Sequence, residues 1–339
     1  MHQHATQSPE SAIELPELPE RLRARGVDRR QFLKFCTTMT AALALPRSYM
    51  PRVAQAIATA VRIPVVWLAF QDCTGDAESF LRAAQPTAES LLLDVLSVEY
   101  HETLMVASGF QAERCLTDVM QRYPGQYVCI ADGAIPTGAG GAYCTIAGRS
   151  ALSMAQEVCT GALATITLGA CSFTGGLPAA SPNPTGAVGV EQAVPNLQTL
   201  INLPGCPVNI VNLVATITHY LTFQRWPALD QYHRPLFAYG EDVHDECERH
   251  DHYEEERFVL AWGDEGHRNG WCLYKMGCRG PRTHHNCSTV RWNSGTSWPV
   301  RAGHGCIGCT EPNFWDTLSP FYVPLTGDDD DGDGGGDDD

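Results

Sequence analysis

Basic residues are scarce in this chain of 339 residues. Its 23 Lys and Arg residues stand against 39 Asp and Glu residues, which gives a net charge of −16. A nucleic-acid partner needs a basic surface, so the charge argues against one. Much of the acidic excess is local, because eight Asp residues lie in the last twelve positions.

The acidic end contains a D-x-D-x-D-G pattern at residues 329–334. A calcium-binding loop also needs a bidentate Glu near its end, and this segment has none. We therefore expect residues 326–339 to form a disordered acidic tail rather than an ion site.

The sequence also lacks an apolar run of about 20 residues, the length that crosses a bilayer. The best candidate, residues 207–223, contains Asn209, Asn212 and His219. Such polar groups are costly in lipid, so this segment is typical of a buried helix of a soluble domain. We expect no transmembrane anchor in this chain.

The first part of the chain has the order of a twin-arginine export signal. Arg29 and Arg30 precede QFLK, a moderately apolar stretch covers residues 35–45, and the small-residue cleavage pattern Ala54-Gln55-Ala56 follows. The alternative is a chance Arg pair on an N-terminal helix. We predict a signal peptide over residues 1–56 and export of the folded chain, to the periplasm or the outer face of the cytoplasmic membrane.

Residues 57–235 alternate between apolar strand-like runs and helix-like segments. The run at 63–70 (IPVVWLAF) is typical of a buried parallel strand, and further candidate strands lie at 126–131, 163–168 and 200–203. Helical patterns such as residues 150–160 lie between them. This alternation predicts an open, mostly parallel α/β sheet.

Three Cys residues follow strands of this sheet, where ligands of such folds gather. Cys73 follows the first strand, Cys171 the run at 163–168, and Cys206 the run at 200–203, each with glycine nearby. Three thiolates at one edge could hold an iron–sulfur cluster, and Asp76 lies where a fourth ligand is expected. The alternative for any single Cys is a small buried apolar residue. We prefer that alternative for Cys36, Cys115, Cys129, Cys144 and Cys159.

Residues 236–325 lose the strand and helix periodicity and become rich in Cys, His, Trp and Gly. Fourteen Cys would suggest disulfides in a small secreted domain, but short spacings near His in a long chain favour metal. Seven soft ligands lie within 66 residues. They divide into a set of four, His244, Cys247, Cys272 and Cys278, and a set of three, Cys287, Cys306 and Cys309.

The set of four could hold zinc as well as an iron–sulfur cluster. A structural zinc site needs four ligands, so the set of three suits a three-iron cluster better. The set of three and the strand-end Cys residues together favour iron–sulfur clusters.

These segments together resemble one family, the small subunits of nickel–iron hydrogenases of the uptake type. The resemblance covers residues 64–321. The motifs that carry it are WLAFQDCTGDAES, LGACSFTGG, LPGCPVNIVNL, HDEC, GWCLYKMGCRGP and TSWPVRAGHGCIGCTEPNFWD.

The resemblance implies a flavodoxin-like domain followed by an irregular iron–sulfur domain. It also implies a heterodimer with a large subunit, whose nickel–iron site oxidises H2, so that this chain supplies no catalytic residue. A cytochrome or another acceptor would take the electrons. The implied clusters are a proximal 4Fe-4S cluster on Cys73, Asp76, Cys171 and Cys206, a medial 3Fe-4S cluster on Cys287, Cys306 and Cys309, and a distal 4Fe-4S cluster on His244, Cys247, Cys272 and Cys278.

The chain departs from the family pattern at the proximal motif. Asp76 stands where the family usually has Cys, as in the actinobacterial-like type. A carboxylate is a harder ligand than a thiolate and should change the potential and lability of the cluster. Gly75 and Gly176 stand where some oxygen-tolerant members have extra Cys, so a six-Cys proximal cluster is not expected.

Two other functions are weighed against this resemblance. The cluster-bearing subunit of respiratory NADH dehydrogenase would match the strand-end region but lack the seven C-terminal ligands. A zinc-stabilised secreted module would leave the strand-end Cys residues without a role.

Overall fold

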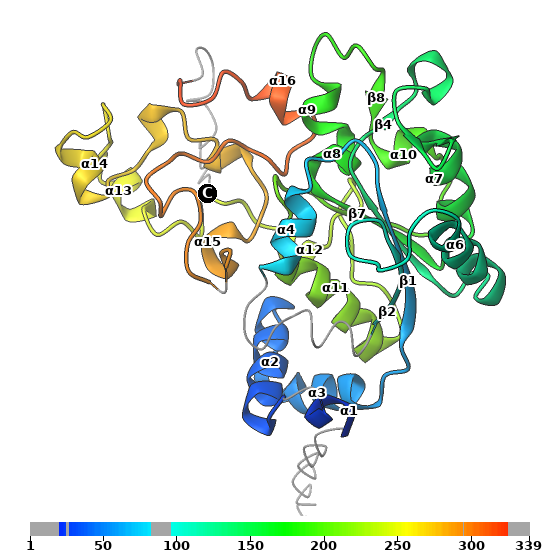
Figure 1. Ribbon diagram of the computed structural model, residues 1–339. Helices are drawn as coiled ribbons and strands as arrows, with labels where there is room; N and C mark the ends of the chain where they lie inside the picture. The colour runs from blue at the N-terminus through cyan, green and yellow to red at the C-terminus, as the bar shows by residue number, and fades with distance from the viewer. Residues whose placement is uncertain (1–19, 25–26, 83–95, 294, 325–339) are drawn as a thin grey trace, which may run out of the picture.

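The computed structural model describes residues 20–24, 27–82, 96–293 and 295–324 (Figure 1). The predicted acidic tail, residues 326–339, lies outside the described residues, as do residues 1–19 of the predicted signal peptide. At the centre is a five-stranded sheet with the order β2-β1-β3-β7-β9, in which every neighbouring pair is parallel. The strands are β1 (Ile63–Ala69), β2 (Leu96–His101), β3 (Val128–Asp132), β7 (Ala164–Leu168) and β9 (Leu200–Leu203).

The expected α/β fold is confirmed. The strands are apolar on both faces because helices cover both sides of the sheet. Val66 and Leu68 pack with α6 (Phe110–Arg122) and α7 (Ala151–Thr160) on one face. Val65 and Trp67 face the other side, toward α4 (Gly75–Leu81) and α11 (Ile210–Phe223).

Short elements complete this half of the chain. They are α1 (Glu20–Ala24), η1 (Arg47–Tyr49), η2 (Gly138–Gly141), α8 (Gly169–Thr174), α9 (Gly176–Ala179), α10 (Val190–Ala193), and the two-stranded pairs β4 (Ile135–Pro136) with β8 (Ala187–Val188) and β5 (Thr145–Ile146) with β6 (Arg149–Ser150).

The helices described at the end of the predicted signal peptide pack against the sheet domain, which the sequence reasoning did not anticipate. Helices α2 (Arg29–Ala42) and α3 (Met50–Thr59) contact α11 (Figure 1). The buried residues of α2 include Phe32, Phe35, Cys36 and Met39, whose i, i+3, i+4, i+7 spacing makes one apolar stripe. Ala54 of the predicted cleavage pattern is fully buried within α3.

The start of α2 leaves the Arg pair accessible. Asp28 caps the helix, accepting from the Gln31 N–H at 2.8 Å, while its own N–H donates to the Gln31 side chain at 2.9 Å. This reciprocal capping box satisfies two backbone donors at the helix start. Arg29 and Arg30 are exposed. Within the described residues, no helix is both long and apolar enough to cross a membrane.

The C-terminal part is irregular, as expected, and is built from single turns around a small core that contains Val243, Val259, Leu273 and Trp298. Its elements are α12 (Leu236–Tyr239), α13 (His250–Glu254), α14 (Glu265–Asn269), η3 (Tyr274–Met276), η4 (Gly280–Arg282), α15 (Cys287–Val290) and α16 (Phe314–Thr317).

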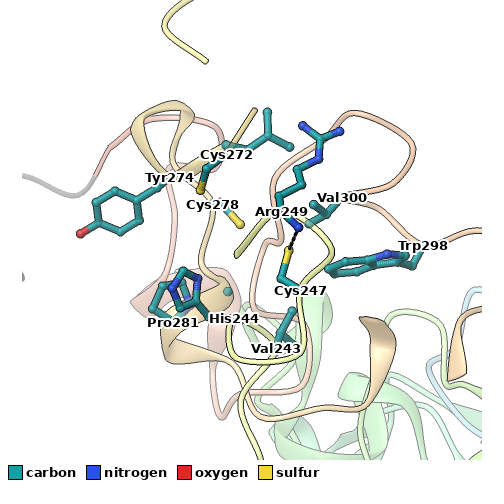
Figure 2. Close-up of a pocket in the computed structure, with 12 residues that line it drawn as sticks. Val243, His244, Cys247, Arg249, Cys272, Tyr274, Cys278, Pro281, Trp298 and Val300 are labelled. Atoms are coloured by element: carbon teal, nitrogen blue, oxygen red, sulfur yellow. Dashed lines mark hydrogen bonds between the residues drawn. The ribbon is translucent and has the colours of Figure 1, made fainter. Parts of the chain in front are cut away.

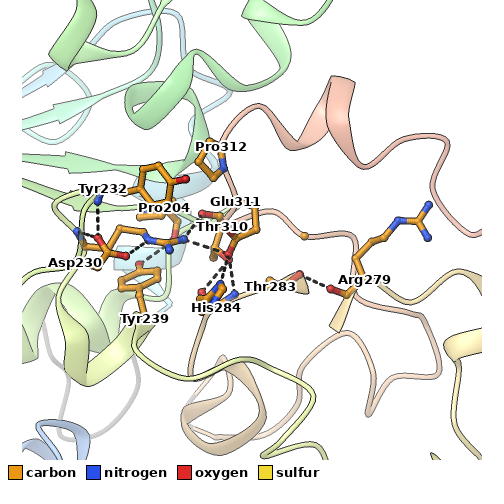
Figure 3. A network of polar contacts seen from close by, with 12 residues as sticks. Pro204, Asp230, Tyr232, Tyr239, Arg279, Thr283, His284, Thr310, Glu311 and Pro312 are labelled. Atoms are coloured by element: carbon orange, nitrogen blue, oxygen red, sulfur yellow. Dashed lines mark hydrogen bonds and ion pairs between the residues drawn. The ribbon is translucent and has the colours of Figure 1, made fainter. Parts of the chain in front are cut away.

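The buried Arg234 joins the two parts of the chain through Asp230, Thr310 and Glu311, the three partners that are labelled in Figure 3. Arg234 is 3% exposed, and its Nε lies 2.7 Å from Asp230 Oδ2. Its Nη1 lies 3.1 Å from Glu311 Oε1 and donates to the Thr310 carbonyl, also at 3.1 Å. The two acceptors directly follow Cys309, so this network positions the end of the C-x-x-C segment against the sheet domain.

Candidate metal centres

The three strand-end Cys residues and Asp76 lie together at the carboxyl edge of the sheet. Cys73 follows β1, Cys171 lies in α8 directly after β7, and Cys206 follows β9. Burial, and then the charges of Asp76, Asp72 and Cys73, raise the pKa of the Cys171 thiol to about 12. Cys206 keeps an exposed surface, but partial loss of water around its thiol, and then the charges of nearby thiols and of Asp76, raise its pKa to about 12. Charges act strongly only over short distances, so the predicted proximal set is brought together.

Asp76 is a buried carboxylate with no cationic partner among the described ion pairs. It is 5% exposed, and its Oδ1 accepts a hydrogen bond of 2.5 Å from the backbone N–H of Val208. Burial raises the pKa of Asp76 to about 6, and the Val208 hydrogen bond opposes that rise. None of the ion pairs among the described residues involves Asp76. Since an unpaired buried charge is costly, the environment of Asp76 suits a carboxylate that holds a metal ion.

Sequence reasoning missed Asp132, the last residue of β3. Its carboxylate is 1% exposed, and one of its oxygens lies within 4.8 Å of oxygens of both Asp72 and Asp76. Burial, followed by the charges of Asp76 and Asp72, raises the pKa of Asp132 well above its usual range. A polar residue at the carboxyl end of a central strand was the available signal.

Glycines make room for the proximal set. A Cβ atom on Gly176 would lie 2.8 Å from the Cys171 Sγ, and one on Gly75 would lie 3.1 Å from the Cys73 Sγ. A Cβ atom on Gly169 would collide with the Asp76 carboxylate. These positions are crowded by the thiols and the carboxylate themselves, so a larger residue at any of them would displace a proposed ligand.

The predicted distal set surrounds one pocket (Figure 2). His244, Cys247, Cys272 and Cys278 all line it. Burial lowers the pKa of His244, and the nearby His250 adds to this effect, so its ring is neutral and can act as a ligand. Its ring centroid lies 4.5 Å from that of Tyr253.

Arg249 brings a buried positive charge to the same pocket. It is 8% exposed, its backbone N–H donates to the Cys247 Sγ at 3.4 Å, and its Nη1 donates to the Trp271 carbonyl at 2.8 Å. Burial raises the pKa of Cys247 to about 11, whereas Arg249 lowers it through that hydrogen bond and its charge. Among the described ion pairs none joins Arg249 to a carboxylate, and while burial raises the pKa of Cys272 and Cys278, the charge of Arg249 lowers it.

The predicted medial set lies between the other two. Burial, and then the charges of Cys309 and Cys306, raise the pKa of Cys287 far above its usual range. The Cys306 Sγ lies 3.5 Å from the Thr283 Oγ1 and accepts from the Gly308 N–H at 3.4 Å. Together with partial loss of water, the charge of Cys309 raises the pKa of Cys206, a proximal residue, so the two thiols lie close together.

The distances between ligand atoms distinguish a site for a single ion from a site for a cluster. Ligands of one zinc ion lie about 4 Å apart, because Zn–S bonds are about 2.3 Å long. Within the described part of the chain, only Asp72, Asp76 and Asp132 offer three ligand atoms that are all within 4.8 Å of one another. The Cys and His sets are more widely spaced, which suits a cluster of several metal ions.

The other five Cys residues, which we expected to be small buried apolar residues, are only partly buried as a group. Cys36, Cys129 and Cys159 are buried, and Cys115 and Cys144 are half-buried. The Cys129 and Cys159 sulfurs lie 3.7 Å apart within the core of the sheet domain.

Comparison with known proteins decides the family. A family model for the C-terminal part of NiFe/NiFeSe hydrogenase small subunits matches residues 239–322. The quinone-reactive Ni/Fe-hydrogenase small chain of Wolinella succinogenes is 45% identical over 306 residues, which cover 90% of this chain and 86% of the relative. The periplasmic NiFe hydrogenase small subunit 1 of Nitratidesulfovibrio vulgaris is 45% identical, with 89% of this chain and 95% of the relative covered.

The chain belongs to the small subunits of nickel–iron hydrogenases. Solved structures agree with this assignment. The NiFeSe hydrogenase of Desulfomicrobium baculatum matches with a TM-score of 0.72 and 33% identity, covering 78% of this chain and 100% of that chain. The actinobacterial-type NiFe hydrogenase of Ralstonia eutropha H16 matches with a TM-score of 0.70 and 25% identity, covering 79% and 84%.

As a hydrogenase small subunit, the chain is the electron-transfer part of an H2-oxidising oxidoreductase and pairs with a large catalytic subunit. Subunits of this family carry iron–sulfur clusters. A family model for the 20 Kd subunit of NADH ubiquinone oxidoreductase matches residues 73–220 only. The seven C-terminal ligands lie beyond that match and inside the hydrogenase one, which favours the hydrogenase over the NADH dehydrogenase alternative.

Proposed function

We propose that this hydrogenase small subunit carries two 4Fe-4S clusters and one 3Fe-4S cluster in a row. When bound, the clusters supply one-electron transfer. The protein would hold them and set their environment, so that electrons from H2 leave the large subunit singly. The proposed ligands are Cys73, Asp76, Cys171 and Cys206 for the proximal cluster, Cys287, Cys306 and Cys309 for the medial cluster, and His244, Cys247, Cys272 and Cys278 for the distal cluster.

One observation carries this proposal: three ligand sets, each too widely spaced for one ion, follow one another in space. Together with partial loss of water, the charge of Cys309 raises the pKa of the Cys206 thiol, and such a charge effect requires a short distance, so the proximal set adjoins the medial set. The Cys306 N–H donates to the Cys278 Sγ at 3.2 Å, which joins the medial set to the distal set. Cys73 and Cys206 are exposed at the proximal end, where a partner subunit would cover them.

Residues 1–56 would direct export of the folded chain by the twin-arginine route, to the periplasm or the outer face of the membrane. Residues 57–235 would form the flavodoxin-like domain, residues 236–325 the domain of the medial and distal clusters, and residues 326–339 an acidic tail. A relative named as periplasmic and another named as quinone-reactive support an exported enzyme with a cytochrome or another membrane acceptor.

Iron and zinc counted on the purified, oxidised heterodimer, together with its electron paramagnetic resonance (EPR) spectrum, test the proposal. We expect one three-iron signal and about twelve irons per heterodimer, of which about eleven belong to the two four-iron clusters and one three-iron cluster of this chain and one to the nickel–iron site of the large subunit. A second three-iron signal with about one iron fewer would mean that Asp76 fails to hold its iron. Zinc in place of iron would refute the proposal.

Variants of Asp76 isolate its role. Asp76→Asn removes the charge but keeps the size, and we expect it to lose about one iron and to add a three-iron signal. Asp76→Cys restores the usual thiolate and should keep all the iron. Asp72→Asn is the matched control, because Asp72 belongs to the same carboxylate group but not to the proposed ligands. Equal iron content in the Asp76→Asn variant and the wild type would show that Asp76 is not a ligand.

A further inference from the structure

His285 is a buried histidine two residues before Cys287, and the ligand sets proposed above do not use it. His285 is 2% exposed, and its Nδ1 lies 2.6 Å from the Cys287 Sγ. The ring is held from two sides. The Tyr239 ring meets it edge-on with centroids 5.0 Å apart, and the Trp292 ring stacks on it at 5.8 Å.

The other ring nitrogen faces an amide donor. The His285 Nε2 lies 3.2 Å from the Asn212 Nδ2. Asn212 forms a reciprocal pair with Asn286, in which each side-chain N–H donates to the other side-chain oxygen at 3.0 Å. An amide nitrogen can donate but not accept, so the His285 Nε2 must be the acceptor.

Both hydrogens of the Asn212 amide have an acceptor. One bonds the Asn286 Oδ1 at 3.0 Å, and the other faces the His285 Nε2. With Nε2 accepting, a neutral His285 ring carries its one hydrogen on Nδ1, which faces the sulfur.

The donor at Nδ1 does not depend on the charge of the ring, because a protonated ring carries a hydrogen on both nitrogens. A neutral ring can donate only one hydrogen bond, and the Asn212 contact directs it to Cys287. The free Cys287 thiol can donate in the opposite sense, but a thiolate bound to iron has no hydrogen and can only accept.

We propose that the Nδ1–H of His285 donates a hydrogen bond to the Cys287 sulfur ligand and thereby raises the reduction potential of the medial cluster. Reduction adds negative charge to the cluster sulfurs, and a donor aimed at sulfur stabilises that charge. His285 is a positioning residue rather than a ligand. This inference rests on the proposed medial site.

Redox titration of the medial three-iron EPR signal in the purified heterodimer tests the inference. His285→Phe keeps a buried ring but removes the donor, and we expect about a tenfold shift toward the oxidised cluster, which is 59 mV for a one-electron couple. His285→Gln keeps a side-chain N–H donor and should retain most of the wild-type potential. His284→Phe is the matched control, because His284 is the neighbouring residue and its half-exposed ring contacts Glu311 instead. Its potential should not change.

A wild-type potential in His285→Phe with the three-iron signal intact would overturn the inference and leave the medial site standing. A second measurement does not depend on the variant holding its cluster. Pulsed EPR of wild-type protein labelled with 15N-histidine should show a nitrogen coupling on the oxidised three-iron signal, and its absence would also overturn the inference. A heterodimer with no three-iron signal would overturn the medial assignment and, with it, the role of His285.

Discussion

The backbone N–H of Cys306 donates a hydrogen bond of 3.2 Å to the Sγ of Cys278, so a residue of one proposed cluster site directly contacts a ligand of the next. Cys306 belongs to the medial set and Cys278 to the distal set. Cys206 of the proximal set lies close to Cys309 of the medial set, whose charge, together with partial loss of water, raises the pKa of the Cys206 thiol. These short distances keep successive sites adjacent, which a relay of single electrons requires.

Removing the charge of Arg249 should lower the potential of the distal cluster. Arg249 lines the same pocket as Cys247, Cys272 and Cys278, its charge lowers the pKa of these thiols against the effect of burial, and no carboxylate offsets it among the described ion pairs. A cluster that gains an electron becomes more negative, so a nearby positive charge favours its reduction. Arg249→Gln should shift the distal reduction equilibrium about tenfold toward the oxidised form in a redox titration, which is 59 mV.

Two further variants define the Arg249 result. Arg249→Lys keeps the charge and should remain near the wild-type potential. Arg301→Gln removes a charge from an exposed arginine that pairs with Glu248 in the same part of the chain, and solvent should screen its effect. Equal shifts in Arg249→Gln and Arg301→Gln would mean that the buried position of Arg249 has no special effect.

Arg234 should be worth far more to stability than an exposed arginine. Arg234→Met leaves the carboxylates of Asp230 and Glu311, which are 15% and 14% exposed, without their cation. Breaking a buried ion pair in this way costs about 3–5 kcal/mol. The midpoint of urea denaturation should fall accordingly.

The exposed pair of Arg82 with Glu78 provides the control for Arg234. Arg82→Met should change the free energy of unfolding by about 1 kcal/mol or less. If both variants moved the midpoint equally, the network in Figure 3 would have no stabilising role beyond that of a surface pair.

The packing of α2 on the sheet domain should protect Cys36 from alkylation in the full-length chain. Cys36 and Phe32 are both fully buried. Phe32→Asp places a carboxylate in an apolar core, which costs several kcal/mol and should detach the helix. Peptide mass spectrometry after a short maleimide pulse should show that Cys36 is labelled at least about tenfold faster in Phe32→Asp than in the wild type. A loss of about 1.4 kcal/mol in the docking free energy of the helix already corresponds to a tenfold change.

The same experiment reports on the predicted cleavage pattern at residues 54–56. Signal peptidase needs access to the backbone there, so Phe32→Asp should also accelerate cleavage. Thr38→Asp adds the same charge at an exposed position of α2 and should leave labelling and cleavage unchanged. Labelling of Cys36 in the unaltered chain as fast as in the denatured chain would rule out a docked α2.

His101 should make stability fall as the solution becomes acidic. It is buried, its Nδ1 accepts from the Thr103 N–H at 3.2 Å, and its ring centroid lies 4.7 Å from that of Trp67. Burial lowers the pKa of His101 to about 4, whereas an unfolded histidine titrates near 6.5. Between these values the unfolded chain binds more protons, so stability rises with pH by up to about 1.4 kcal/mol per unit.

Denaturation midpoints measured from pH 7 to pH 4 test the role of His101. His101→Gln cannot take up the proton, so its stability should depend less steeply on pH than that of the wild type across this window. Parallel curves for the two proteins would assign the acid sensitivity to other groups.

The sequence by itself determined the elements and the ligand spacings. The strands at 63–70 and 200–203, the helix at 150–160 and the motifs around Cys247 and Cys309 were all readable, because periodicity and short-range spacing are local properties of a chain. The family resemblance followed from the same local motifs. The fold class predicted from them is confirmed by the parallel sheet.

Only the tertiary structure decided which distant groups meet. Asp132 lies near Asp76 because β1 and β3 are neighbours in the sheet. The His285 Nε2 faces the side-chain amide of Asn212, which is 73 positions away in the sequence. The docking of α2 on α11 likewise depends on an apolar surface formed far along the chain. Such contacts follow from strand order and side-chain packing, which no local pattern of residues encodes.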